Sequence, residues 1–451
     1  MRSGRVLGAL AAAAMIIAAG CAPGSDNSGG DDEPSPSSVE TDVASMGDIT
    51  LTVWDQEVRS GQDKPLQELN KEFMERYPNI TIKRVSRSFT DLQKQLRLAI
   101  TGNDVPDVVQ ANNTRGDMGA FVKAGLLRPL DSYAEVYGWD DRFPASIRAA
   151  SSYSSDGKTF GEGNLYGLPL TGEFIGVWFN KAKLDKLGIE PPTTLADFEA
   201  ALKKAKDAGE IPIQFGDKEG WPGIHELGFL QDMYAAKDDI RTLGYGREGG
   251  SWDTAENKKA AQTLVDWVKD GYFTDGFNGI DYDPSWQAFA KGQGVFLISG
   301  TWLLADLQPA LGDDLGFMLP PTGDTGDLTV TGATGLPFAI TKASEHADAA
   351  AAYIDFITSK DAMAKITKAG GLPIVDSGVA VSGTQKELFD AWEKARSEDA
   401  LVPYLDWSTP DAYDLITADV QELMGGDKSV DDVIGDLQKD YSSFVADNAG
   451  G

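Results

Sequence analysis

Short runs of alternating apolar and polar residues are separated, in the first part of the chain, by segments with helical periodicity. Residues 49–53 alternate and predict a strand, and the apolar residues within 66–74 share one face of a helix. A second strand is expected at 80–85 and a third at 105–109, with another helix between them. Strands that alternate with helices predict an α/β fold with a largely parallel sheet.

Polar and aromatic side chains follow two of these strands directly. Trp54 and Gln56 come after the first strand, and Asn112 and Asn113 come after the third. In open α/β sheets, ligands bind beyond the carboxyl ends of the strands. Gln56, Asn112 and Asn113 are therefore candidate ligand contacts.

The stretch from residue 165 to residue 181 marks the expected change from one lobe to another. Two strand-like runs flank Thr171 and Gly172, and Glu173 follows among apolar neighbours. Glycine adopts backbone angles that other residues resist, and a carboxylate in such surroundings needs hydrogen-bond donors or water. A donor-rich ligand held between two lobes would supply them. The alternative interpretation is a core strand with one Glu at its exposed end.

Aromatic residues recur at later breaks in the pattern. Trp221 is expected in a loop that precedes an amphipathic helix at 253–270. A buried strand at 295–298 leads to Trp302, which either faces a cleft or fills a core. Residues 330–340 form an extended run, interrupted by glycines, that would recross between the lobes.

Length and charge limit the possible functions. A chain of 451 residues is too long for one hydrophobic core and predicts two or more domains. The 70 acidic residues outnumber the 40 basic ones and give a formal net charge of −30. This balance argues against nucleic acid as a partner, because such binding depends on neutralising phosphates.

The N-terminus has the features of an export signal. Arg2 and Arg5 precede an uncharged run at 6–19 that is too short for a comfortable membrane span. Cys21 is the only cysteine in the chain and follows the expected cut after residue 20, as in a bacterial lipoprotein signal, where this cysteine is lipidated. The alternative is plain secretion with an incidental cysteine. Residues 21–47, rich in Gly, Ser, Asp and Pro, are expected to form a disordered tether.

Several kinds of chemistry find no support in the sequence. One cysteine and two histidines far apart do not supply a zinc cluster or a Cys/His dyad, and neither a Walker A motif nor a G-x-S-x-G elbow occurs. Residues 244–249 match G-x-G-x-x-G in letters but lack the strand and helix context of a dinucleotide site. Asp281 and Asp283 are a close pair that chance explains in so acidic a chain. We expect no cofactor, no metal and no catalysis.

What remains is a supply of Trp, Asn, Gln, Glu and Asp at strand ends and in loops. Carboxylates and amides exchange hydrogen bonds with hydroxyl groups, and indole faces cover the apolar side of a sugar ring. These side chains suit a neutral polyol.

A family resemblance is carried by segments spread along the chain. In order and spacing they are similar to the extracellular solute-binding proteins of ABC importers, of the sugar-binding, maltose-binding-protein-like type, from about residue 48 to 445. The segments are 102–107, 125–127, 166–169, 173–181, 289–302 and 332–340.

The resemblance implies two α/β lobes joined by hinge crossings, with the ligand in a central cleft and closure around it. It places one lobe at 48–172 plus 335–359 and the other at 173–334 plus 360–448. By position, the resemblance assigns ligand contact to Gln56, Asn112, Asn113, Glu173, Trp221, Trp302, Thr334, Asp406 and Trp407.

The resemblance also implies partners and a location. A sugar or oligosaccharide would be delivered to the permease subunits of an ABC importer by a monomer held at the extracytoplasmic face of the bacterial cell membrane through Cys21. Two alternatives stay open. One is a binding protein for a peptide, polyamine or metal ion, and the other is a secreted carbohydrate-active enzyme.

Overall fold

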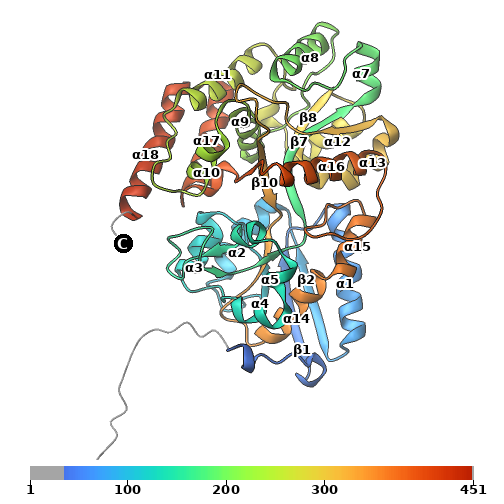
Figure 1. The fold of residues 1–451 in the computed structure, drawn as a ribbon, viewed down its shortest axis with the longest axis vertical. Helices are drawn as coiled ribbons and strands as arrows, with labels where there is room; N and C mark the ends of the chain where they lie inside the picture. The colour runs from blue at the N-terminus through green and yellow to red at the C-terminus, as the bar shows by residue number, and fades with distance from the viewer. Residues whose placement is uncertain (1–34, 449–451) are drawn as a thin grey trace, which may run out of the picture. The chain divides into compact units, whose positions relative to one another are not determined.

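The computed structural model describes residues 35–448, which form two β-sheets with helices packed around each (Figure 1). None of the helices in this part of the chain has the length and hydrophobicity that a membrane-spanning segment requires. We call the first sheet with its helices the first lobe, and the second sheet with its helices the second lobe. This two-lobed α/β architecture is the fold class that the sequence predicts.

The first sheet contains both parallel and antiparallel strands. β1 pairs in parallel with β2 and β3, while β11 runs antiparallel to β3 and β6. The order is β2 (Ile80–Ser86), β1 (Ile49–Asp55), β3 (Val108–Gln110), β11 (Pro337–Ile340) and β6 (Leu168–Pro169). A two-stranded ribbon of β4 (Ser152–Tyr153) and β5 (Asn164–Leu165) lies apart from this sheet.

The second sheet is built around one long, fully buried strand, β7 (Gly172–Asn180). β7 runs antiparallel to β8 (Phe296–Gly300), β9 (Leu315–Met318) and β10 (Val330–Thr334), and β10 pairs in parallel with β12 (Leu401–Val402). The expectation of a largely parallel sheet therefore holds for β1 to β3 and is wrong for the other pairs of these two sheets, which are antiparallel except for β10 with β12. The chain passes repeatedly from one lobe to the other, and β11, which follows the return to the first lobe, enters its sheet antiparallel to β3 and β6.

Helices cover both sheets and pack their apolar faces into separate cores. Those of the first lobe are α1 (Ser60–Arg76), α2 (Phe89–Ala99), α3 (Ala120–Lys123), α4 (Asp131–Tyr137), α5 (Trp139–Arg142), α6 (Ala145–Ala149), α14 (Ala347–Ile357) and α15 (Lys360–Lys368). Those of the second lobe are α7 (Lys181–Leu187), α8 (Leu195–Asp207), α9 (Trp221–Tyr234), α10 (Lys237–Gly244), α11 (Ala255–Lys269), α12 (Tyr282–Ala290), α13 (Leu304–Leu311), α16 (Gly383–Ser397), α17 (Ala412–Gly425) and α18 (Val430–Asn448).

Three short segments connect the lobes. Residues 170–171 join β6 to β7, and residues 335–336 join β10 to β11. A third passage lies beside the first, since the backbone N–H of Gly172 donates to the carbonyl of Leu372 at 3.1 Å. Gly335 has no room for a side chain, because a Cβ there would lie 2.6 Å from the hydroxyl of Thr171 and 2.8 Å from the carboxylate of Glu173. The crossings therefore pack closely against one another.

One helix replaces an expected loop. Trp221 lies in the first turn of α9, and nearly every side chain from Pro222 to Tyr234 is buried. A helix that is buried on nearly all sides has no exposed polar face, so its sequence shows no clear amphipathic period and does not indicate a helix. The consequence for the pocket is that Trp221 is fixed at a helix N-terminus instead of in a loop.

The expectation of disorder up to residue 47 is wrong for residues 35–47. This segment contains two short 3₁₀ turns, Pro36–Ser38 and Val43–Ser45, and Val43 is buried in the first-lobe core. The side-chain amide of Asn79 also donates to the carbonyls of Val43 and Gly47. The export signal, Cys21 and the rest of the expected tether lie outside the described residues.

Packing of the segment after residue 359 bears on where the first lobe ends. α15 packs against α1, and Met363, Ile366 and Ile374 belong to the first-lobe core. We therefore propose that the last segment of the first lobe extends to about residue 374.

Candidate functional site

A pocket of about 810 Å³, including the part open to solvent, lies where the carboxyl ends of first-lobe strands meet the second lobe. All nine candidate contacts named from the sequence line it. Its full lining is Gln56, Glu57, Arg59, Gln62, Phe89, Asn112, Asn113, Glu173, Trp221, Ile224, His225, Trp302, Thr334, Leu336, Tyr404, Asp406, Trp407 and Tyr413.

The loop after β1 supplies the polar residues of the first-lobe wall. Gln110, at the end of β3, bridges this loop: its side-chain carbonyl accepts from the backbone N–H of Gln56 at 2.8 Å, and its amide donates to the Glu57 carboxyl at 2.7 Å. Burial raises the pKa of Glu57 to about 7. The loop therefore presents a carboxyl that titrates near neutral pH.

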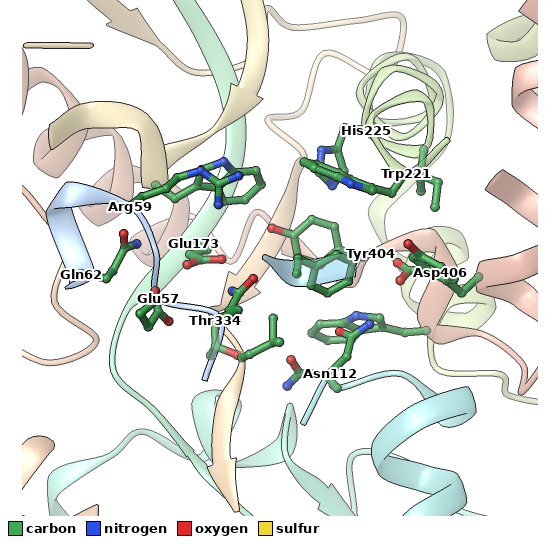
Figure 2. A pocket seen from close by; sticks show the side chains of 18 residues that line it. Glu57, Arg59, Gln62, Asn112, Glu173, Trp221, His225, Thr334, Tyr404 and Asp406 are labelled. Carbon is green, nitrogen blue, oxygen red and sulfur yellow. The ribbon is translucent and has the colours of Figure 1, made fainter. Parts of the chain in front are cut away.

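Arg59 stands at the N-terminus of α1 and reaches the second lobe. Its guanidinium lies 3.0 Å from the carboxylate of Asp283 and 5.4 Å from the centre of the Tyr282 ring. The positive charge of Arg59 also lowers the pKa values of Glu57 and Glu173, although burial of both carboxyls outweighs it. Figure 2 shows Arg59, Glu57 and Glu173 on the same side of the pocket.

Asn112 and Asn113 follow β3 and differ in their bonding. The amide nitrogen of Asn112 is buried and has no hydrogen-bond partner among the described residues. That of Asn113 donates to the carbonyl of Ala150. Asn112 is therefore free to donate to a ligand, whereas Asn113 is engaged in holding the first lobe together.

Glu173 lies at the start of β7, directly after the first crossing. Its side chain is 7% exposed and accepts one hydrogen bond, from the hydroxyl of Thr171 at 3.1 Å. Burial raises its pKa to about 8, and the nearby Glu57 carboxyl adds to the rise. The alternative of an exposed Glu at a strand end is wrong, since Glu173 is buried and faces the pocket (Figure 2).

Thr334, the last residue of β10, points into the same part of the pocket (Figure 2). It is 3% exposed, and its hydroxyl has no partner among the described residues. Buried polar groups are normally hydrogen-bonded. An unpaired hydroxyl and the unpaired amide of Asn112 are thus two positions where a ligand would complete the bonding.

The second-lobe wall is aromatic. The His225 ring lies 5.7 Å from each of the Trp302 and Tyr404 rings and 5.4 Å from the Trp221 ring, centre to centre. Burial lowers the pKa of His225 to about 3, which keeps the imidazole neutral at physiological pH. This wall therefore offers flat, weakly polar surfaces to a ligand.

Trp302 is held by a dedicated hydrogen bond. It lies in the turn after β8, folds back over Gly300, where a Cβ would lie 2.0 Å from the indole ring, and donates its N–H to the Tyr282 hydroxyl at 2.7 Å. Its indole is only partly buried and lines the pocket. Of the two interpretations of Trp302, the structure supports the one in which it faces a cleft.

The segment after β12 completes the pocket with Tyr404, Asp406 and Trp407. Burial raises the pKa of Asp406 to about 7. The Trp407 ring lies 5.4 Å from the ring of Phe160 and belongs to a core cluster of the first lobe. This second-lobe segment therefore contacts the first lobe directly.

Sequence reasoning missed half of the lining residues. Glu57 and Arg59 lie one and three residues after the named Gln56, and Tyr404 lies two residues before the named Asp406. The end of a strand therefore did mark these positions, but the prediction named too few of the residues around it. His225 and Ile224 had no signal, because the helix that presents them was not expected. The unnamed lining residues are Glu57, Arg59, Gln62, Phe89, Ile224, His225, Leu336, Tyr404 and Tyr413.

The geometry favours binding of an uncharged, hydroxylated molecule. Carboxyl, amide and hydroxyl groups converge with indole and phenol rings, as specific ligand pockets require. No group of three or more potential metal ligands occurs within residues 35–448.

Comparison with known proteins agrees with the fold. The family model described as bacterial extracellular solute-binding protein matches residues 59–364. The multiple sugar-binding protein of Streptococcus mutans is 24% identical over 335 residues, which cover 73% of this chain and 76% of the relative. The maltotriose-binding protein of Pyrococcus abyssi is 24% identical over 289 residues, covering 62% of this chain and 56% of the relative.

Solved structures share the architecture. A chitin oligosaccharide binding protein superposes with a TM-score of 0.74 at 22% identity, over 88% of this chain and 99% of the other. The solute-binding protein RafE in complex with raffinose superposes with a TM-score of 0.68 at 22% identity, over 88% of this chain and all of the other. At this identity the likeness shows the fold. Together with the family match over most of its length, it establishes that this chain belongs to the bacterial extracellular solute-binding protein family.

Proposed function

We propose that this protein captures a sugar or oligosaccharide by closure of its two lobes and delivers it to an ABC importer. The observation that carries the proposal is the composition of the pocket, which opposes carboxyl and amide groups of the first lobe and hinge to indole and phenol rings of the second. A pyranose presents hydroxyls at its edge and C–H groups on its faces, and each wall suits one of these surfaces. The names of the relatives, among them multiple sugar-binding and maltotriose-binding proteins, support the same class of ligand.

The pocket residues come from both lobes, and this explains why a ligand would favour lobe closure. A ligand that contacts Asn112 on the first lobe and Trp302 on the second makes both sets of contacts only when the lobes are together. It therefore shifts an open–closed equilibrium toward the closed form. A nearly complete switch needs a preference of about 5.5 kcal/mol for the closed form. The permease subunits would then recognise the closed form.

Isothermal titration against maltotriose, raffinose, xylobiose, diacetylchitobiose and the common monosaccharides tests the proposal. We expect micromolar or tighter binding of at least one of them, and mass spectrometry of the mixture should show that saccharide unaltered. No heat with any saccharide, together with binding of a peptide, polyamine or metal ion, would reject the sugar. Release of reducing ends would identify an enzyme instead.

We further propose that the mature protein is a monomer anchored through a lipid on Cys21 at the extracytoplasmic face of the membrane. The basic residues, apolar run and single cysteine at the N-terminus support this. In a bacterial host the protein should fractionate with membranes, and Cys21→Ser should release it to the medium. Membrane association that Cys21→Ser leaves unchanged would contradict the anchor.

A further inference from the structure

Tyr282, the first residue of α12, is buried behind the aromatic wall and does not itself line the pocket. Its hydroxyl accepts the N–H of Trp302 at 2.7 Å and lies 2.7 Å from the hydroxyl of Ser299 on β8. Its ring lies 4.4 Å from that of Trp221, centre to centre. One side chain thus contacts two of the three indoles that line the pocket, those of Trp302 and Trp221.

The Tyr282 side chain also lies beside the ion pair that joins the two lobes. The Arg59 guanidinium, which comes from the first lobe, lies 5.4 Å from the centre of the Tyr282 ring. Asp283, the next residue of α12, accepts from Arg59 at 3.0 Å and from the indole N–H of Trp286 at 2.8 Å. Asp283 is therefore held in place by its own lobe while it pairs with the other.

These contacts form one continuous chain from the ligand surface to the lobe interface. It runs from Trp302 through Tyr282 to Arg59 and Asp283, and each side chain in it contacts the next. Arg59 is itself part of the pocket lining. Movement of Arg59 on opening would remove the cation from the Tyr282 ring and the partner from Asp283 at the same time.

We propose that Tyr282 is a positioning residue that couples the orientation of Trp302 and Trp221 to closure of the lobes through the Arg59–Asp283 ion pair. The indole surface is set for stacking when the pair is formed, and a stacked ligand in turn favours the pair. This inference rests on the proposed function for the nature of the ligand. The coupling between Tyr282, Asp283 and closure is a separate claim that is testable without any ligand.

The first test removes the Tyr282 hydroxyl and keeps its ring. The probe is whichever of maltotriose, raffinose, xylobiose and diacetylchitobiose binds the unaltered protein most tightly. Tyr282→Phe should raise its Kd about tenfold, since the N–H of Trp302 loses its acceptor. In a Trp302→Phe background, which has no indole N–H, Tyr282→Phe should change the Kd less than twofold.

Tyr353→Phe is the matched control. Its hydroxyl likewise makes a 2.7 Å hydrogen bond in a buried site, in this case by donating to Asn70 in the first-lobe core. It should lower the thermal midpoint without changing the Kd. Additive effects of Tyr282→Phe and Trp302→Phe, or a Kd for Tyr282→Phe within twofold of the unaltered value, would overturn the positioning role.

The second test addresses closure in the absence of ligand. Asp283→Asn keeps an acceptor for Trp286 but removes the charge that pairs with Arg59. In protein labelled with a fluorophore on each lobe, Asp283→Asn should lower the fraction of the high-transfer, closed population and weaken its dependence on salt. Asp281→Asn is the control, because Asp281 pairs with Lys218 at 2.9 Å within the second lobe.

The outcomes separate the two claims. An unchanged population in Asp283→Asn, or an equal loss in Asp281→Asn, would overturn the coupling whether or not a sugar binds. If no saccharide binds the unaltered protein, the proposed function fails, and the labelled protein still decides whether the ion pair favours closure.

Discussion

The two walls of the pocket differ in chemistry and in how they are held. The first-lobe wall is mainly polar and is presented by loops at the ends of β1 and β3, tied together by Gln110. The second-lobe wall is mainly aromatic and is presented by helix and turn termini around Tyr282. Hydrogen-bonding groups need a defined direction, whereas stacking needs an area. We therefore expect the first lobe to select ligands by the pattern of their hydroxyl groups, and the second lobe to supply most of the binding affinity.

The largest expected effect lies on the aromatic wall. Trp302→Ala removes the indole surface together with its bond to Tyr282, and the Kd for the preferred saccharide should rise about 100-fold, as for other central aromatic anchors. Isothermal titration measures this. Trp139→Phe, which alters a first-lobe indole bonded to Asp355, should leave the Kd unchanged. If Trp302→Ala raised the Kd less than Glu173→Gln or Asn112→Ala does, the polar wall and not the aromatic wall would supply most of the affinity.

The second largest effect concerns Glu173 at the hinge. Glu173→Gln replaces a carboxyl, which accepts hydrogen bonds from hydroxyl groups, with an amide in which one acceptor oxygen becomes an N–H donor, and the Kd should rise about tenfold. The same variant should also change the free energy of unfolding, in a direction that follows from the raised pKa of Glu173. Because the pKa of Glu173 is raised to about 8 in the folded chain from an ordinary 4.5, the carboxyl costs stability as pH rises from about 4.5 toward 8.

Thermal unfolding at several pH values shows whether the variant is more or less stable than the unaltered protein. The midpoint of Glu173→Gln should equal that of the unaltered protein near pH 4.5 and exceed it by roughly 2 °C near pH 8.5. Glu210→Gln is a control of opposite sign, since hydrogen bonds from Lys183 and Lys186 lower the pKa of Glu210 and its charge stabilises the fold above that pKa. A midpoint difference for Glu173→Gln that does not change with pH would contradict the raised pKa.

Adjacent asparagines on the first-lobe wall give a sharper contrast. Asn112→Ala removes a donor that has no partner in the described structure, so the Kd should rise about fivefold with little loss of stability. Asn113→Ala deprives the Ala150 carbonyl of its donor and should cost about 1–2 kcal/mol in the free energy of unfolding, with a smaller change in Kd. Urea unfolding and titration of both variants separate the two roles, and equal profiles would refute the distinction.

The smallest expected effect is at Thr334. Thr334→Val keeps the shape of the side chain and removes a buried hydroxyl that has no partner among the described residues. Stability should be unchanged or slightly higher, and the Kd should rise about threefold because a ligand hydrogen bond is lost. An unchanged or lower Kd would show that the ligand leaves this hydroxyl unpaired.

Local pattern was informative wherever a residue's role depends on its neighbours in the chain. Alternation and helical periodicity identified β1, α1 and β2. The break at Thr171 and Gly172 marked the first crossing, and strand ends pointed to Gln56 and Asn112. The same pattern failed for α9, because a helix buried on all sides has no polar face to reveal its period.

The sequence by itself determined the α/β character, the two lobes and a set of polar and aromatic residues suited to a hydroxylated ligand. Tertiary structure alone decided that Arg59 meets Asp283, 224 residues further on, and that Tyr282 supports Trp302. It also decided that Asn113 is bonded while Asn112 is not, and that Glu173 titrates near pH 8. Periodicity reports which face of an element is buried. Partners, unpaired atoms and pKa values depend on which other elements are packed against that face.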